Sequence, residues 1–62
     1  MTITLAAAEI GKARLVRFEF VLVPCVIRNA MQAYGRWLFE VVPVNGDGQQ
    51  WVEQVRVHGL ES

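Results

Sequence analysis

PCVIRNAMQAYGRW, residues 24–37, occupies the middle of the chain and decides how the segments on either side are joined. On a helical wheel at about 100° per residue, its apolar side chains gather on one arc and its polar side chains on the other. Pro24 suits the first turn of a helix, and Gly35 suits the left-handed position that follows the last turn. The segment therefore predicts one helix of about ten residues that packs one face on a sheet. The apolar arc holds Val26, Ile27, Ala30, Met31, Ala33 and Tyr34.

The preceding segment, residues 2–24, predicts a β-hairpin. Over positions 16–22, Val16, Phe18, Phe20 and Leu22 alternate with Arg17, Glu19 and Val21, which is the period of a strand. The pair at positions 11–12 has glycine first, as a type II′ turn prefers. A hairpin closed there places Glu9 opposite Arg14 and apolar residues opposite one another, so the register is consistent.

A short helix is the alternative for the start of the chain. Residues 5–10, LAAAEI, contain alanine and glutamate, which favour helices. Such a helix has only about two turns and is marginal without packing. We therefore prefer the hairpin for this segment.

The following segment, residues 36–60, predicts two strands around the glycine-rich loop NGDG. A loop of residues 45–48 places Glu40 directly against Glu53, which sets like charges opposite each other. A loop of residues 45–49, with a glycine bulge, places these two carboxylates on opposite faces of the sheet. The longer loop is preferred because it also gathers Trp37, Phe39 and Trp51 on one apolar face.

Together these segments predict an α+β fold of the order ββαββ. It is a four-stranded antiparallel sheet from two hairpins, with one helix packed on one face, in a single domain spanning residues 1–62. The predicted core comprises Ile3, Leu5, Phe18, Phe20, Leu22, Trp37, Phe39, Val41, Trp51, Val55 and Val57. The second face also carries apolar residues, namely Leu15, Val21, Leu38, Val42 and Val52. Because one helix cannot cover both faces, we expect a second copy or another protein to cover this one.

The composition favours association and argues against several classes of protein. Hydrophobic residues make up 53% of the chain, and with glycine included the apolar share exceeds the roughly 45–50% typical of soluble domains. Six basic and six acidic residues balance, so no strong field points to nucleic acid or a membrane surface. The apolar run over residues 20–27 is too short to span a bilayer, and the start of the chain lacks a basic leader. We expect a cytoplasmic protein.

Few residues carry recognisable chemistry. The NGDG loop has one carboxylate and no following lysine, so a hairpin turn is favoured over a phosphate or calcium site. Cys25 is the only cysteine, which excludes an internal disulfide. A structural or inert thiol is favoured, and the alternative is a reactive thiol whose pKa is lowered by the predicted helix start. His58, the only histidine, lies far along the chain and gives that thiol no evident base. We expect no enzyme activity, no cofactor and no bound metal.

The function predicted from these features is a small non-enzymatic module, of the regulator or inhibitor type, that binds a partner protein as a homodimer. The alternative is nucleic-acid binding through a ridge of Arg28, Gln32 and Arg36, which lie four apart on the predicted helix. A third class is a small subunit of a larger enzyme complex. The residues predicted to bind a partner are Arg28, Gln32, Arg36, Leu38, Val42, Val52 and Arg56.

Overall fold

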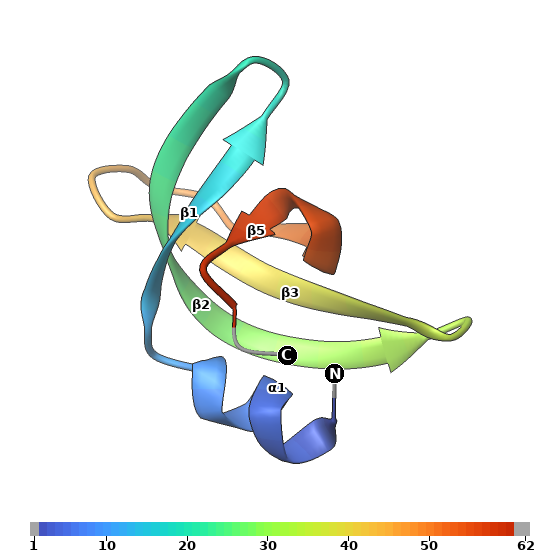
Figure 1. Ribbon diagram of the computed structural model, residues 1–62. Coiled ribbons are helices and arrows are strands. Elements are labelled where there is room, and N and C mark those ends of the chain that lie inside the picture. Colours follow the sequence, from blue (N-terminus) through green and yellow to red (C-terminus); the bar gives the residue numbers. More distant parts are fainter. Residues whose placement is uncertain (1, 61–62) are drawn as a thin grey trace.

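A strongly curved antiparallel sheet carries one short helix, as the computed structural model shows (Figure 1). The structure describes residues 2–60. The strands lie side by side in the order β4-β3-β2-β1-β5, and all neighbours are antiparallel. The last described strand therefore returns to the first, and β4 and β5 form the two edges of the sheet. In chain order the elements are α1 (Ile3–Glu9), β1 (Ala13–Phe18), β2 (Val21–Ala33), β3 (Arg36–Pro43), β4 (Gln50–Glu53), the 3-10 helix η1 (Gln54–Arg56) and β5 (Val57–His58).

The predicted α+β class is confirmed, but the predicted ββαββ order is wrong. The helix comes first in the chain, and the described residues form a five-stranded sheet. The order was wrong because helix and strand were exchanged in two segments. These are the first ten residues and the segment 24–37.

Helix α1 forms where a strand was predicted. The hydroxyl of Thr2 accepts a hydrogen bond from the backbone N–H of Leu5 at 3.2 Å, which caps the first turn. Ala6 and Glu9 are each only 1% exposed, so tertiary packing supports a helix that is marginal alone. The hairpin predicted for residues 2–24 is therefore wrong, and the short helix that was the alternative is correct.

The segment predicted to be the central helix is the long strand β2. The pairing of β2 with β3 shifts between Ile27 and Asn29, so Arg28 is an extra residue in a β-bulge. Ile27 and Ala30 pair with the buried residues Val41 and Phe39, so both face the core although they are three apart in sequence. A spacing of three is also the spacing of a helix, which is why the helical wheel misassigned this segment.

Gly35 has the left-handed backbone that was predicted, but it serves a different structure. Its φ is 74°, and that of Tyr34 is 53°. These two residues connect the closing pair Ala33 and Arg36 of the β2–β3 hairpin. Two consecutive positive φ values are the geometry of a type I′ hairpin turn rather than of a helix end.

The β3–β4 connection confirms the predicted turn and corrects its register. Phe39 pairs with Val52, not with Val55 as the loop of residues 45–49 required. The connection is longer than either predicted loop, because it runs from residue 44 to residue 49. Its first residue donates a backbone hydrogen bond to the Pro24 carbonyl at 2.9 Å, which holds the connection against β2. The predicted second strand also stops early, where η1 turns the chain across to β1.

The core is smaller than predicted. Phe39, Val41 and Val57 are buried, as expected. Phe20, by contrast, is 99% exposed in the β1–β2 turn, and Val55 is 73% exposed in η1. The buried apolar residues of the described chain are Ala6, Val16, Cys25, Ile27, Phe39, Val41, Val52 and Val57, with Phe18, Val23, Ala30, Trp37 and Leu60 packed against them.

Candidate functional site

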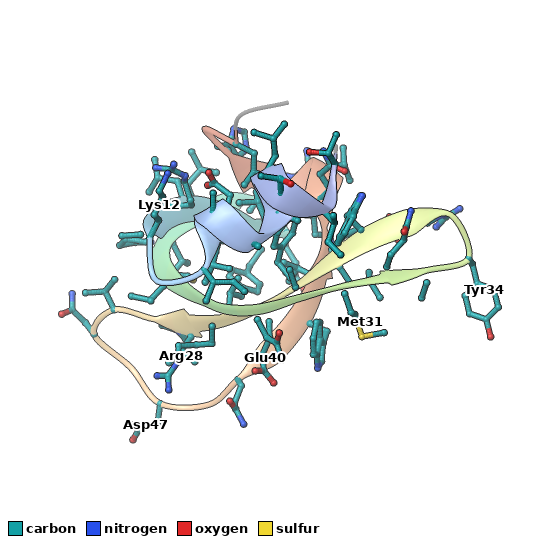
Figure 2. The ribbon with its side chains drawn as sticks, turned by 90° about the horizontal axis from the view of Figure 1, so that it is seen from below. Lys12, Arg28, Met31, Tyr34, Glu40 and Asp47 are labelled. Atoms are coloured by element: carbon teal, nitrogen blue, oxygen red, sulfur yellow. The ribbon has the colours of Figure 1, made fainter. Side chains whose placement is uncertain are left out.

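The outer face of the sheet over β2, β3 and β4 carries a group of apolar side chains. Met31 lies directly opposite Leu38, and Trp51 lies opposite Glu40. Met31 and Trp51 are each 42% exposed, while Leu38 and Val42 are half-buried. Figure 2 shows Met31 and Glu40 on the side of the sheet away from α1. We call Met31, Leu38, Val42 and Trp51 the outer patch.

Charged side chains of both signs share the sheet face with the outer patch. Arg28 and Glu40 project from the same face of the sheet (Figure 2). Within residues 2–60 neither side chain forms a hydrogen bond or an ion pair. Arg36 donates to Glu53 at 3.0 Å, but the two side chains are 69% and 48% exposed, so solvent weakens this pair. Glu40 lies between Leu38 and Val42 on β3 and opposite Trp51, so the outer patch contains a carboxylate among its apolar side chains.

The predicted ridge of Arg28, Gln32 and Arg36 does not exist, because it required a helix. Arg28 occupies the bulge of β2, and Arg36 begins β3 on the outer face. Gln32 pairs with Trp37, whose ring lies against the core on the inner face. The three side chains therefore do not form one line on one surface.

The remaining predicted binding residues divide between surface and core. Leu38 and Val42 lie on the outer face, as predicted. Val52 was predicted there too, but it is 3% exposed, because the observed register turns it toward Phe39. Arg56 is exposed in η1, outside the outer patch.

Met31 and Trp51 are the members of the outer patch that sequence reasoning missed, and Met31 was assigned to the packed face of the predicted helix. Trp51 was predicted in the core, on the assumption that the loop spans residues 45–49. The observed register places it on the outer face, opposite Glu40. Glu40 and Glu53 were predicted on opposite faces, yet both lie on the outer one. No sequence signal fixed this register, because the hairpin loop is longer than the tight turns that define register.

Cys25 is enclosed rather than reactive. It is 0% exposed in β2, and its Sγ donates to the Val23 carbonyl at 3.5 Å. Burial raises the pKa of the Cys25 thiol, which disfavours the nucleophilic thiolate. The alternative of a pKa lowered by a helix start does not apply, because Cys25 lies in the strand β2. His58 is exposed in β5, opposite Leu15.

Glu9 is a buried carboxylate with two cationic partners. Arg14 Nε donates to its Oε1 at 2.7 Å, and Arg14 Nη2 lies 3.4 Å from its Oε2. Lys12 Nζ lies 3.6 Å from the same Oε2. The hydrogen bond from Arg14 holds the pKa of Glu9 below its usual value. The contact between Glu9 and Arg14 was predicted, although as a pair across a hairpin and not between a helix and a strand.

The loop residues 45–48 were weighed as a ligand site. Asp47 lies at the exposed turn between β3 and β4 (Figure 2). Among residues 2–60, no group of three or more His, Cys, Asp and Glu side chains is arranged to hold a metal ion.

Among the described residues, no helix has the length and apolar character needed to cross a membrane. No protein-family model, no curated protein and no solved structure matches the chain.

Proposed function

We propose that this chain is a small non-enzymatic module that forms a homodimer through the outer patch and acts by binding a partner protein. The observation that carries the proposal is the exposure of Trp51 and Met31 beside Leu38 on the face that α1 does not cover. Tryptophan and methionine are enriched in the centres of protein interfaces. The proposed role is that of a stoichiometric regulator or inhibitor.

The charges on the same face as the outer patch favour a second copy as its occupant. In a dimer with a two-fold axis the contacts are reciprocal, so a pair formed between two different residues is formed twice. Arg28 and Glu40 lie on the same face without partners among the described residues. In the proposed dimer the Arg28 of each copy faces the Glu40 of the other copy, which gives two equivalent pairs of opposite charge across the interface.

The remaining features fit a binding role better than catalysis. Cys25 is enclosed with a raised pKa, and Glu9 is already occupied by Arg14. We propose the cytoplasm as the compartment, since a single free thiol fits a reducing environment. The nucleic-acid alternative loses the helix ridge that motivated it, and Arg36 is engaged by Glu53.

Sedimentation equilibrium from low to high micromolar concentration tests the proposal. We expect the wild-type chain to dimerise and the Trp51→Lys variant to remain a monomer with an unchanged circular-dichroism spectrum. Loss of a central tryptophan costs about 2 kcal/mol or more in such interfaces, about 30-fold in the dissociation constant. Phe20→Lys is the matched control, because Phe20 is equally apolar but lies in the β1–β2 turn. A monomeric wild type, or a dimer of Trp51→Lys, contradicts the proposal.

A further inference from the structure

The last part of β2 has a neighbouring strand on one side only. β1 pairs with β2 only over residues 21–26 of β2. The preceding chain makes its last backbone contacts with β2 at Ile27, which donates to the Lys12 carbonyl at 3.0 Å and accepts from the Gly11 N–H at 2.7 Å. Within the described residues, positions 29–33 therefore pair with β3 alone. We call the unpaired side of residues 29–33 the open edge of β2.

The open edge presents backbone donors and acceptors. Ala33 and Arg36 close a two-residue hairpin, and such a closing pair exchanges both of its backbone hydrogen bonds. Because the direction of the backbone groups alternates along a strand, the N–H and C=O groups of Ala30 and Gln32 point away from β3. The Ala30 N–H donates to Oδ1 of Asn29 at 2.9 Å, so a side chain bonds it where a neighbouring strand would.

Helix α1 borders the open edge and leaves a groove of about 190 Å³ between the two. Figure 1 shows α1 beside β2. The helix wall of the groove is apolar, because Ile3, Ala7 and the C-cap residue Ile10 recur at the spacing of one helix face. All three are exposed. The groove therefore combines an apolar wall with a row of backbone hydrogen-bonding groups.

The sequence of the open edge lacks two common protections of an exposed strand. Residues 29–33, NAMQA, contain no charged residue and no proline, both of which discourage the addition of another strand. The edge strand β4 has four residues and ends at Glu53, and the edge strand β5 has only two residues. The open edge of β2 is therefore better suited than β4 or β5 to accept a further strand.

We propose that a partner protein adds an extended segment to the open edge of β2 as a further strand and places a large apolar side chain in the groove against Ile3 and Ala7. The inference rests on the proposed protein-binding function and names the surface and the backbone conformation of that partner. A strand suits the site because its N–H and C=O groups complement those of the open edge, while its alternate side chains face α1. In the complex the Ala30 N–H exchanges the Asn29 side chain for a carbonyl group of the partner.

A single segment fits this site better than a second copy or a nucleic acid. Two antiparallel β2 strands joined by a two-fold axis would place both α1 helices on the same face of the joined sheet. The second helix would then compete for the space beside the first, where the groove holds only about 190 Å³. A sugar–phosphate backbone has no N–H groups for the carbonyls of the open edge, and the groove lining contains no lysine or arginine.

Selection from a random-peptide display library against the full chain, followed by titration of a synthetic peptide of the enriched sequence, tests this inference. We expect enriched peptides to contain β-branched or aromatic residues at alternate positions. Amide hydrogen exchange of the isotope-labelled chain then reports the backbone pairing. The Gln32 amide should exchange about tenfold more slowly with the peptide bound, whereas the Met31 amide, which pairs with β3, should change little.

Peptides methylated at single backbone nitrogens separate strand addition from binding by side chains alone. Only alternate N–H groups of an added strand face β2. Methylation of these nitrogens should weaken binding about tenfold or more, and methylation of the nitrogens between them should leave the affinity unchanged.

Ala7→Glu and Ala8→Glu form a matched pair of variants. Both alanines are exposed on α1, but Ala7 lines the groove and Ala8 does not. Glutamate favours helices, so both variants should keep the wild-type circular-dichroism spectrum. Ala7→Glu should weaken the peptide about tenfold or more, because it places a charge in the apolar groove, and Ala8→Glu should not.

Several outcomes overturn the inference. These are no enrichment from the library, equal affinities of the two glutamate variants, no alternation in the methylated series, or slower exchange at Trp51 of β4 instead of Gln32. Slower exchange at Gln32 with rising chain concentration and no peptide overturns it in favour of a second copy. Failure of the outer-patch dimer is separate, because a monomeric chain that binds the peptide at Gln32 loses only the dimer.

Discussion

Arg14 Nε lies 2.7 Å from Oε1 of Glu9 and joins the end of α1 to the start of β1 through a buried carboxylate. Glu9 is 1% exposed, and the Arg14 side chain is 24% exposed. A carboxylate in this position is costly to bury unless it is paired, so the contacts with Arg14 and Lys12 offset the cost of burying Glu9. The short helix thus depends on this ion pair as well as on the packing of Ala6.

Substitution of Glu9 should therefore destabilise the fold. Glu9→Ala is expected to lower the free energy of unfolding by about 2–4 kcal/mol, because it removes the buried carboxylate that Arg14 and Lys12 contact and leaves a small cavity. Urea unfolding followed by circular dichroism measures this loss. Glu19→Gln is the control, because Glu19 is exposed and should lose less than about 0.5 kcal/mol. Equal losses in the two variants contradict the role of the ion pair.

The same pair predicts how stability depends on pH. Since the folded chain lowers the pKa of Glu9 below its usual 4.5, the stabilisation is complete above that value. It is lost as the pH falls below 4.5 and through the lowered folded pKa. Urea unfolding at a series of acidic pH values should show a steeper decline for the wild type than for Glu9→Gln. Parallel curves for the two proteins are the contrary result.

The protein should become more stable when Tyr34, in the turn between β2 and β3, is replaced by asparagine. Tyr34 has a φ of 53° and is fully exposed, so no packing offsets its unfavourable backbone. Asparagine tolerates this conformation and is preferred in type I′ turns. We expect Tyr34→Asn to raise the free energy of unfolding by about 0.5–1 kcal/mol. Phe20→Asn, at an equally exposed turn position without a positive φ, should give no such gain. A loss of stability in Tyr34→Asn would count against this geometry.

The β3–β4 connection should tolerate insertion. Asp47 is exposed in a connection that runs over residues 44–49, and loop entropy grows slowly with length. Insertion of a short glycine–serine segment after Asp47 should cost less than about 1 kcal/mol. The same insertion between Tyr34 and Gly35 should cost clearly more, because it breaks a two-residue turn. Thermal unfolding compares the two, and a reversed order contradicts the assigned turns.

Cys25 should be unreactive until the protein unfolds. It is fully buried, and its pKa is raised by desolvation. We expect a thiol reagent at neutral pH to label the native chain far more slowly than the urea-unfolded chain. An exposed cysteine introduced as Val44→Cys in a Cys25→Ala background provides the fast reference. Equal labelling rates in the native wild type and the reference are incompatible with an enclosed thiol.

The spacing of apolar residues along the sequence predicted some strands and core residues correctly. It failed where a β-bulge or a long loop changes the spacing. The alternation around Val16 identified β1, and Phe39 and Val41 were correctly predicted to be buried. The extra residue Arg28 moved Ile27 and Ala30 to a helical spacing, so β2 was taken for a helix. Helix propensity alone did not distinguish a helix from a strand in the first ten residues. The burial of Ala6 and Glu9 against the sheet favours the helix.

Only part of the outer patch was predicted, because the position of each member depends on the strand or register assigned to it. Leu38 and Val42 were placed on the outer face, since they alternate along a strand that was correctly identified. Trp51 was missed because its position depends on a register that the longer connection sets. The groove between α1 and β2 was not predicted, since it requires a helix at the start of the chain and a strand in place of the predicted central helix.

Self-association through the outer patch is tested most directly by the fluorescence of Trp51 alone. In a Trp37→Phe variant, Trp51 is the only tryptophan of the chain. We predict that its emission shifts to shorter wavelength as the concentration rises through the micromolar range, because the 42% exposed ring becomes buried against a second copy. An emission maximum that stays at the wavelength of a solvent-exposed tryptophan at every concentration would contradict the proposed dimer.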